Sequence, residues 1–368
     1  MRVESINGAP NVLTLLDPPM KRRHFLACAG ALALAPWTAR AQERALKFAD
    51  MHSHAGVGRR IDNMRALMAD NGMLLIARAI ATDRPVTHKV KGRITVAREA
   101  QPGELAANFD DRLARLHTTL QREGLTEIVS AETLEHVLAR HIPAAVIAAE
   151  GGDFLEGSLQ RLEAARKDGL VHLQLVHFRI SEIGDISTEA PRYNGLSTFG
   201  REVVAACNRL GILIDIAHGT SALIEQTLEL STRPVIYSHG QASDTEPHYT
   251  QRVTAARAIH LPVARKVAQK GGVVGIWANG GSYSTLDRYA DALLELADAL
   301  GPTHVGVGTD MNGMTRMVVP TYREFFELAE LMAKRGVDAA DLGNMLGGNY
   351  IRVLKIALTG GEPAKGGA

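Results

Sequence analysis

Short apolar runs alternate along the chain with segments in which apolar residues recur three and four positions apart. The short runs predict buried strands at residues 46–51, 73–80, 144–149, 171–176, 212–217, 234–238, 273–278 and 304–309. The intervening segments predict helices at 113–122, 158–167, 264–270, 289–300, 325–334 and 341–356, with another beginning at Ser221. The run 73–80 is also compatible with a helix. Strands that alternate with helices favour a parallel sheet, and eight such units predict an α/β fold, a (β/α)8 TIM barrel of amidohydrolase-like type.

Six of the eight predicted strands end in side chains of the kind that bind metals. These ends carry His52-Ser53-His54, Glu150, His177, His218, His239 and Asp310. The carboxyl ends of all strands in a parallel barrel meet at one face, where enzymes of this fold have their active sites. The pattern therefore predicts a metal-dependent hydrolase.

Five of these residues are candidate metal ligands. His52 and His54 stand two apart at a strand end, so both imidazoles point to one side and can reach one metal. Glu150 follows a wholly apolar strand, and its two oxygens could bridge two cations. His218 and His239 end neighbouring strands and could supply imidazole nitrogens to a second metal, as zinc prefers.

The other two strand-end residues are candidates for catalysis. Asp310 ends the last strand, where its carboxylate could take a proton from a water that a metal activates. His177 could polarise a carbonyl or hold an oxyanion, or it could be a hydrogen-bonded core histidine. The chain shows no G-x-S-x-G nucleophile elbow and no phosphate-loop pattern.

Composition excludes several other classes of function. Hydrophobic residues make up 46% of the chain and charged residues 22%, which is ordinary for a globular protein with a large core. The formal net charge is +1, and no basic stripe interleaved with aromatic residues points to nucleic acid. No apolar run is long enough to span a bilayer.

The first 41 residues have the pattern of an export signal. Lys21-Arg22-Arg23-His24-Phe25-Leu26 precedes an apolar stretch and then Ala39-Arg40-Ala41. The paired arginines resemble a bacterial twin-arginine signal, so we expect residues 1–41 to engage the twin-arginine export machinery and the protein to be periplasmic or otherwise exported. The alternative is a buried N-terminal helix. The barrel would then occupy 42–358 as one domain, followed by a flexible Gly- and Pro-rich tail at 359–368.

Two connections after predicted strands are long and polar. They cover residues 82–104 and 240–258, and both would lie over the mouth of the barrel. We interpret the second as a lid or substrate-binding loop, with Tyr249 and Arg252 as its candidate substrate contacts.

Several segments resemble the renal or membrane dipeptidase family of the amidohydrolase superfamily. The matching segments are 149–152, 175–177, 211–218, 234–239, 271–275, 305–313 and 347–353, and they occur in family order. The resemblance implies a binuclear zinc dipeptidase that uses a metal-bound hydroxide, and it suggests a homodimer. It further implies that Glu150 bridges the metals, that His177 binds substrate and that Asp310 carries the proton.

The chain departs from this family pattern at two positions. His54 stands where the family has aspartate, and the exchange leaves the site more positive by one charge. Ser243 stands four residues after His239, where the resemblance implies an arginine that holds the terminal carboxylate of the dipeptide. Arg252, ahead of Arg257 or Arg179, is our candidate replacement.

Two alternatives to a dipeptidase stay open. One is a metallohydrolase of other small amides, such as lactams or N-acyl amino acids. The other is a barrel without catalysis that serves as a periplasmic binding protein, which need not hold two equivalents of zinc.

Overall fold

A computed structural model describes residues 47–56, 63–314 and 316–359. The predicted signal at 1–41, and the predicted tail apart from Thr359, lie outside the described residues. In the described part of the chain, no helix is long and apolar enough to cross a membrane.

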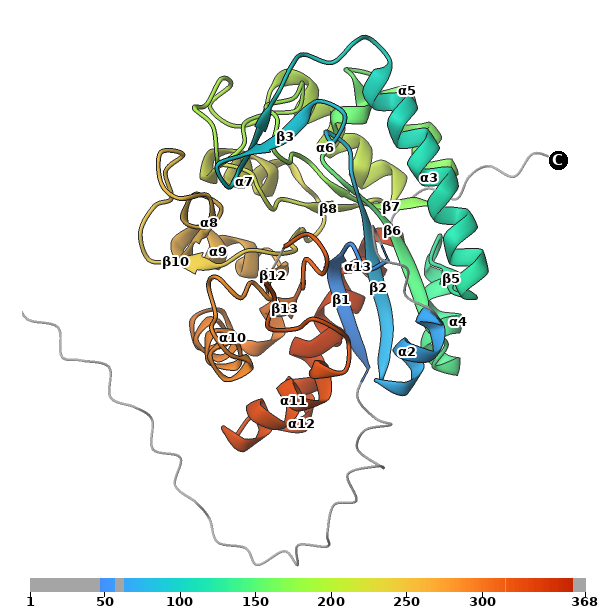
Figure 1. Cartoon of the computed structure of the whole chain (residues 1–368), viewed down its shortest axis with the longest axis vertical. Helices are drawn as coiled ribbons and strands as arrows, with labels where there is room; N and C mark the ends of the chain where they lie inside the picture. The colour runs from blue at the N-terminus through green and yellow to red at the C-terminus, as the bar shows by residue number, and fades with distance from the viewer. Residues whose placement is uncertain (1–46, 57–62, 315, 360–368) are drawn as a thin grey trace, which may run out of the picture. The chain divides into compact units, whose positions relative to one another are not determined.

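Eight parallel strands form a nearly closed barrel, as the sequence predicted (Figure 1). In sheet order they are β1 (Phe48–Ser53), β2 (Met73–Ala81), β6 (Ala144–Glu150), β7 (Leu170–Gln174), β8 (Leu213–Asp215), β9 (Ile236–Tyr237), β12 (Val273–Ile276) and β13 (Val305–Val307). A short ninth strand, β5 (Thr126–Glu127), pairs with β6. The last strand meets the first beyond its end, where Asp310 donates its backbone N–H to the carbonyl of His52 at 2.9 Å. This junction brings Asp310 next to the His52–His54 segment.

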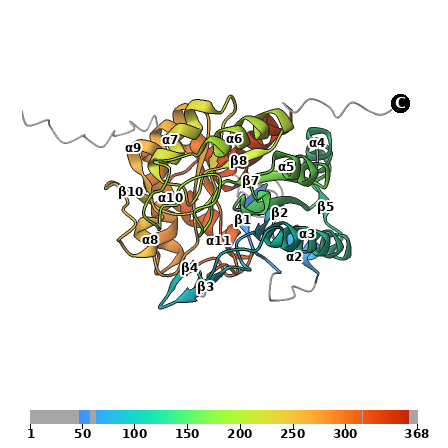
Figure 2. The same ribbon diagram turned by 90° about the horizontal axis from the view of Figure 1, so that it is seen from above.

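Helices surround the strands (Figure 2). They are α2 (Met64–Asp70), α3 (Glu104–Glu123), α4 (Ala131–Arg140), α5 (Leu159–Lys167), α6 (Thr198–Leu210), α7 (Ser221–Leu230), α8 (Val253–Ala256), α9 (Leu261–Gln269), α10 (Leu286–Leu300), α11 (Glu324–Lys334), α12 (Ala339–Gly343) and α13 (Asn349–Leu358). Short 3₁₀ turns lie at Asp153–Leu155 and Pro302–His304. The connections from a helix to the next strand are short, as at 168–169 between α5 and β7, whereas those from a strand end to the next helix are longer, as at 175–197 between β7 and α6.

The alternation of side chains along β6 shows how the barrel directs residues to its mouth. Ala144, Val146 and Ala148 belong to one buried cluster, and the residues between them belong to another. Because strand side chains alternate between two faces, Glu150 continues the series of Val146 and Ala148 beyond the last apolar position. The carboxylate is therefore held at the carboxyl end of the barrel.

The ambiguous run at 73–80 is a strand, β2, which confirms the strand prediction, and all nine of its residues are buried. The single helix expected at 341–356 is divided into α12, a π-helical turn at Asn344–Gly348, and α13. The reason is packing against β1: a Cβ on Gly347 would lie 2.2 Å from the carbonyl oxygen of Lys47.

The two long connections contain small elements of their own. The first folds into a hairpin, β3 (Thr87–Val90) and β4 (Arg93–Val96). The second contains α8 and a two-residue strand, β10 (Ala242–Ser243), which pairs with β11 (Ile259–His260). Arg93 of the hairpin donates hydrogen bonds to the backbone carbonyls of Thr188 and Tyr249, so the two connections are tied together.

Candidate metal centre

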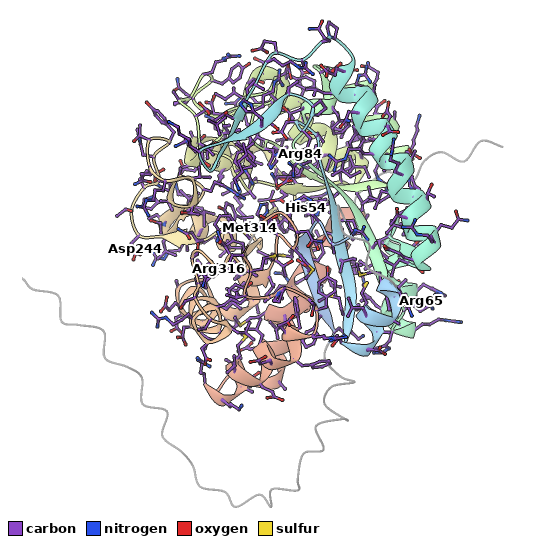
Figure 3. The ribbon with its side chains drawn as sticks, in the orientation of Figure 1. His54, Arg65, Arg84, Asp244, Met314 and Arg316 are labelled. Atoms are coloured by element: carbon purple, nitrogen blue, oxygen red, sulfur yellow. The ribbon has the colours of Figure 1, made fainter. Side chains whose placement is uncertain are left out.

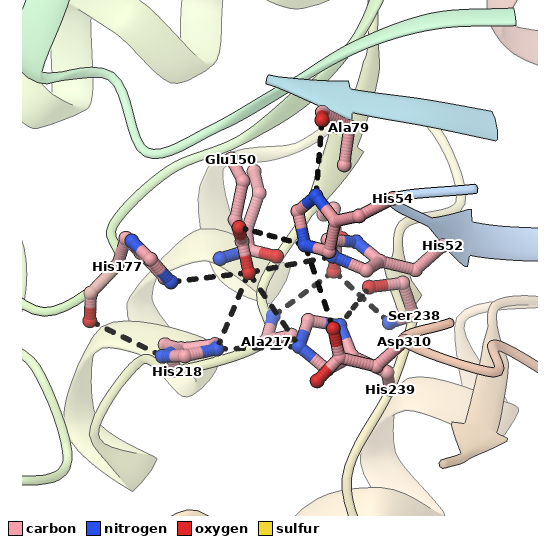
Figure 4. A network of polar contacts seen from close by, with 12 residues as sticks. His52, His54, Ala79, Glu150, His177, Ala217, His218, Ser238, His239 and Asp310 are labelled. Carbon is pink, nitrogen blue, oxygen red and sulfur yellow. Dashed lines mark hydrogen bonds and ion pairs between the residues drawn. The ribbon is translucent and has the colours of Figure 1, made fainter. Parts of the chain in front are cut away.

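Seven buried side chains from six strand ends converge at the mouth of the barrel (Figure 4). They are all of the strand-end residues singled out in the sequence: His52, His54, Glu150, His177, His218, His239 and Asp310. Each is at most 8% exposed. Figure 3 shows His54 near the middle of the molecule in that view, with Asp244 at the margin.

The spacing of the nitrogen and oxygen atoms fits metal coordination. Nε2 of His52 lies 3.4 Å from Nε2 of His54, and 3.3 Å from Oε1 of Glu150. Nε2 of His218 lies 3.2 Å from Nε2 of His239, and each is 3.8 Å from the same glutamate oxygen. Ligands about 2.1 Å from a tetrahedral zinc stand about 3.4 Å from one another. The residues present therefore fit two divalent cations, with Glu150 between them.

The outer ring nitrogens are held so that Nε2 faces the centre. Nδ1 of His54 donates to the carbonyl of Ala79 at 3.1 Å, and Nδ1 of His218 donates to the carbonyl of His177 at 3.2 Å. Nδ1 of His239 lies 2.9 Å from the hydroxyl of Ser238. A proton on Nδ1 leaves the lone pair on Nε2, which is the form that binds a metal.

Electrostatics at the centre depend on Glu150. Burial alone would raise the pKa of this carboxyl, but His177, His52 and His54 hold it well below its usual range. Burial opposes the charged form of His54 as well, yet Glu150 and Asp310 raise its pKa to about 9. Positive charge is therefore favoured on His54, whereas burial holds the pKa of His218 and of His239 well below the usual range.

Two residues of the cluster have left-handed backbone conformations. His218 has φ 68° and Asp310 has φ 53°, which is unusual for residues other than glycine. Such strain is typical of functional sites, where the surrounding structure holds it in place. Gly313 leaves room for Asp310, because a Cβ on Gly313 would lie 2.0 Å from Oδ1 of that carboxylate.

Asp310 lies at the edge of the cluster, with Oδ1 3.4 Å from Nε2 of His54. Its backbone is tied to β1 by the hydrogen bond to His52. Within the described part of the chain, one ion pair, with His54, joins this carboxylate to the candidate metal centre.

His177 is paired with an aspartate that sequence reasoning missed. Asp83, which follows β2, accepts from Nδ1 of His177 at 2.8 Å and from the backbone N–H of Phe178 at 3.0 Å. Nε2 of His177 lies 3.1 Å from Glu150. Although burial lowers the pKa of His177, Asp83 and Glu150 raise it to about 10. The imidazole is thus a charged donor beside the centre.

One arginine of the long loop after β9, Arg257, lies in the site. Its Nη2 lies 2.6 Å from Nε2 of His218 and 2.8 Å from Nε2 of His239. Its backbone carbonyl accepts a hydrogen bond from the hydroxyl of Tyr237, which anchors the end of the loop on β9. Arg257 is 7% exposed.

The other arginine candidates lie elsewhere. Arg252 is exposed at the start of α8, where it lines a surface hollow with Lys91 and Arg93. Arg179 forms ion pairs with acidic side chains, and its Nη1 lies 3.1 Å from Oδ1 of Asp153. The structure therefore places Arg257, and not Arg252, against the histidine cluster, and the role predicted for Arg252 in binding substrate stays a prediction.

Among the described residues, Tyr249 has no hydrogen bond or ring contact with the histidine cluster, and it lines a neighbouring cavity. That cavity, of about 290 Å³, lies beside the loop that follows His218 and is also lined by Ser187, Gly219 and Thr220. Tyr249 packs against His248 with ring centroids 4.3 Å apart.

Asp83 is the functional candidate that the sequence pattern did not mark. It follows the end of β2, which with β12 is one of the two strands that supply none of the seven cluster residues. The strand-end argument that found the histidines would have found Asp83 as well, because a carboxylate is also a metal-type side chain.

Comparison with known proteins agrees with this geometry. The model of the membrane dipeptidase family, peptidase family M19, matches residues 96–365. Dipeptidase tcpJ of Claviceps purpurea is 28% identical over 221 residues, 58% of this chain and 50% of that protein. Dipeptidase 3 of Mus musculus is 29% identical over 229 residues, 58% of this chain and 44% of that protein. The chain spans about half the length of these curated relatives.

Solved structures share the fold at low sequence identity. An amidohydrolase from Pseudomonas aeruginosa has a TM-score of 0.71 at 20% identity, covering 87% of this chain and 99% of its own. A metallopeptidase from Rhodobacter sphaeroides, liganded with a phosphinate mimic of the dipeptide L-Ala-D-Ala, has a TM-score of 0.69 at 19% identity, covering 85% and 99%. Both similarities extend to the N-terminal part of the barrel that lies before the family match.

Proposed function

The chain belongs to the membrane dipeptidase family of metallopeptidases, and on this basis we propose that it is a binuclear zinc hydrolase that cleaves the peptide bond of small dipeptides. The observation that carries the proposal is the convergence of imidazole and carboxylate atoms at 3.2–3.8 Å from separate strand ends. His52 and His54 would hold one cation, His218 and His239 the other, and Glu150 both. Held there, the two cations would supply Lewis-acid activation of water and of the scissile carbonyl.

The remaining residues of the site supply proton transfer and positioning. Oδ1 of Asp310 faces the cluster, so it can accept a proton from the attacking water and return it to the leaving amine. Nε2 of His177, charged through Asp83, can donate to the carbonyl oxygen as negative charge develops there. Both groups act from a buried setting, where such electrostatic contacts are stronger than in water.

The buried Arg257 favours a substrate that ends in a carboxylate. A guanidinium pairs with a carboxylate through two parallel hydrogen bonds, which an uncharged group cannot match. A dipeptide satisfies this requirement, and so does an N-acyl amino acid, which is the second candidate substrate class. Lactams are favoured only where they carry a neighbouring carboxylate.

A substrate panel tests the proposal. The zinc-loaded protein is assayed against L,L and L,D dipeptides, N-acyl amino acids and the C-terminal amide of each, and its metal content is measured in parallel. We expect hydrolysis of free-acid substrates at close to two zinc per chain. Hydrolysis of N-acyl amino acids in preference to dipeptides would favour the second class, and failure on the whole panel despite full metal loading would contradict the hydrolase proposal.

We also propose that the protein is exported, a proposal supported by the twin-arginine pattern at Arg22-Arg23 and the Ala39-Arg40-Ala41 site. N-terminal sequencing of protein from the periplasmic fraction should give residue 42 as the first. Retention of Arg22 in a protein that stays with the cytosolic fraction would contradict it.

A further inference from the structure

Trp277 lies just past the end of β12 and faces the barrel interior. Two residues earlier, a Cβ added to Gly275 would meet Ser238 and Met51 inside the barrel, so the side-chain position of residue 275 faces inward. Because strand side chains alternate, Trp277 points to the same side one step nearer the mouth. The indole is 1% exposed, so it forms part of the buried wall at the carboxyl end of the strands.

The indole is stacked against the arginine of the candidate metal centre. The guanidinium carbon of Arg257 lies 4.6 Å from the centroid of the Trp277 ring and 5.4 Å from that of Phe178. The same guanidinium contacts Nε2 of His218 and of His239 through Nη2. These nitrogens would hold the second cation, so Nη2 must leave them, and becomes available to substrate, when that cation binds. Arg257 therefore lies between Trp277 and two of the candidate metal ligands, His218 and His239.

Two hydrogen-bond donors in this stack have no partner among the described residues. They are Nε1 of Trp277 and Nε of Arg257, and both are buried. Buried donors in native proteins are nearly always paired, with protein, water or ligand. Donors that lack a protein partner and belong to two side chains in contact at an active centre can be satisfied by an acceptor in the bound state.

We propose that Trp277 is a specificity-determining residue whose indole N–H, together with the guanidinium of Arg257, holds the anionic terminal group of the substrate. The proposal rests on the proposed function, since it names the group that the hydrolase recognises. A carboxylate presents an acceptor oxygen to each of the two donors. A C-terminal amide can present only one, and its NH₂ then faces a donor without a partner. Trp277 therefore selects the acid over the amide beyond the effect of the arginine charge.

The chain offers a direct optical test. It has two tryptophans, and Trp37 lies outside the described residues, so Trp37→Phe leaves Trp277 as the one emitting indole. The probes are the phosphinate mimic of L-Ala-D-Ala and its C-terminal amide, titrated into zinc-loaded protein. We expect a saturable change in Trp277 emission with the acid probe, and no emission change at saturation would overturn the proposal.

The matched variant is Trp277→Phe, which keeps an aromatic ring against Arg257 and removes only the N–H. Calorimetric titration should show the acid probe bound about tenfold more weakly, as expected for one hydrogen bond to a charged group, with the amide changed less than about twofold. An equal loss on both probes, or none on either, would show that the indole only packs. If this variant does not fold, the emission titration of the Trp37→Phe protein decides alone.

Failure of this proposal is distinguishable from failure of the proposed function. Binding is measured without turnover, so selective loss of the acid probe can occur in a protein that hydrolyses none of the panel. Conversely, a wild-type protein that cleaves dipeptides, paired with a Trp277→Phe variant of unchanged acid preference, would contradict the role of the indole alone.

Discussion

Replacing Arg257 by methionine is the sharpest test of how this site recognises its substrate. Methionine keeps an unbranched apolar stem between Phe178 and Trp277 and removes the charge and its donors. Arg257 is buried, so its pairing with a carboxylate is little screened by solvent. A hydrogen bond to a charged group contributes about 1.5–3 kcal/mol, which corresponds to a roughly 10- to 150-fold rise in KM.

The assay compares a free-acid substrate with its C-terminal amide under the same metal loading. For Arg257→Met we expect the full rise in KM with the acid and a change below about threefold with the amide. Arg252→Met is the matched control, because Arg252 is exposed at the start of α8 and should leave both values unchanged. Equal losses on acid and amide, or a larger effect of Arg252→Met, would refute the assignment of Arg257 as the carboxylate anchor.

Metal content separates this effect from damage to the centre. Nη2 of Arg257 donates to Nε2 of His218 and His239, the same lone pairs that a cation would use. Removing the guanidinium frees these nitrogens and removes a like charge. Arg257→Met should therefore bind zinc at least as tightly as wild type in a chelator competition, and loss of one equivalent would show that the arginine supports the metal site itself.

Three further changes test the rest of the site and the barrel. Glu150→Gln should reduce zinc from about two per chain toward one or less, since the variant has one oxygen acceptor in place of a charged bridge; two tightly bound equivalents would contradict the bridging role. Asp310→Asn should lower kcat by roughly 10²–10⁴ at unchanged metal content, the usual range for general acid–base catalysis, and full activity would exclude the carboxylate from proton transfer. Gly275→Ala should reduce the free energy of unfolding by about 1–3 kcal/mol in denaturant titrations, because its Cβ would lie 2.1 Å from a backbone oxygen of the neighbouring strand. Gly343→Ala, which meets nothing within 4 Å, is the control and should not destabilise the protein; equal effects of the two would contradict the packing argument.

The barrel and its strand-end chemistry were predictable because both follow from local rules. A run of buried residues predicts a strand wherever it occurs, and parallel strands place their carboxyl ends at one face. His218 and His239 could therefore be expected near one another although 21 positions separate them. The same rule, applied to the two strand ends that supply none of the seven cluster residues, leads to Asp83 and Trp277.

The arginine of the site could not be chosen from the sequence. Arg252 and Arg257 flank the four residues of α8, and five positions at about 100° each point them roughly 140° apart around the helix axis. Which of them faces inward depends on how the loop is anchored, and that anchor is the hydroxyl of Tyr237 on the carbonyl of Arg257. No pattern along the chain marks this contact.

The sequence by itself determined the order of strands and helices, and the residue types that stand at the mouth of the barrel. Only the tertiary structure decided the distances between ligand atoms, the pairing of His177 with Asp83 and the stack of Arg257 on Trp277. The physical reason is the separation along the chain over which each effect acts. Strand periodicity depends on residues that are neighbours in the sequence, whereas a site depends on contacts between residues that only folding brings together.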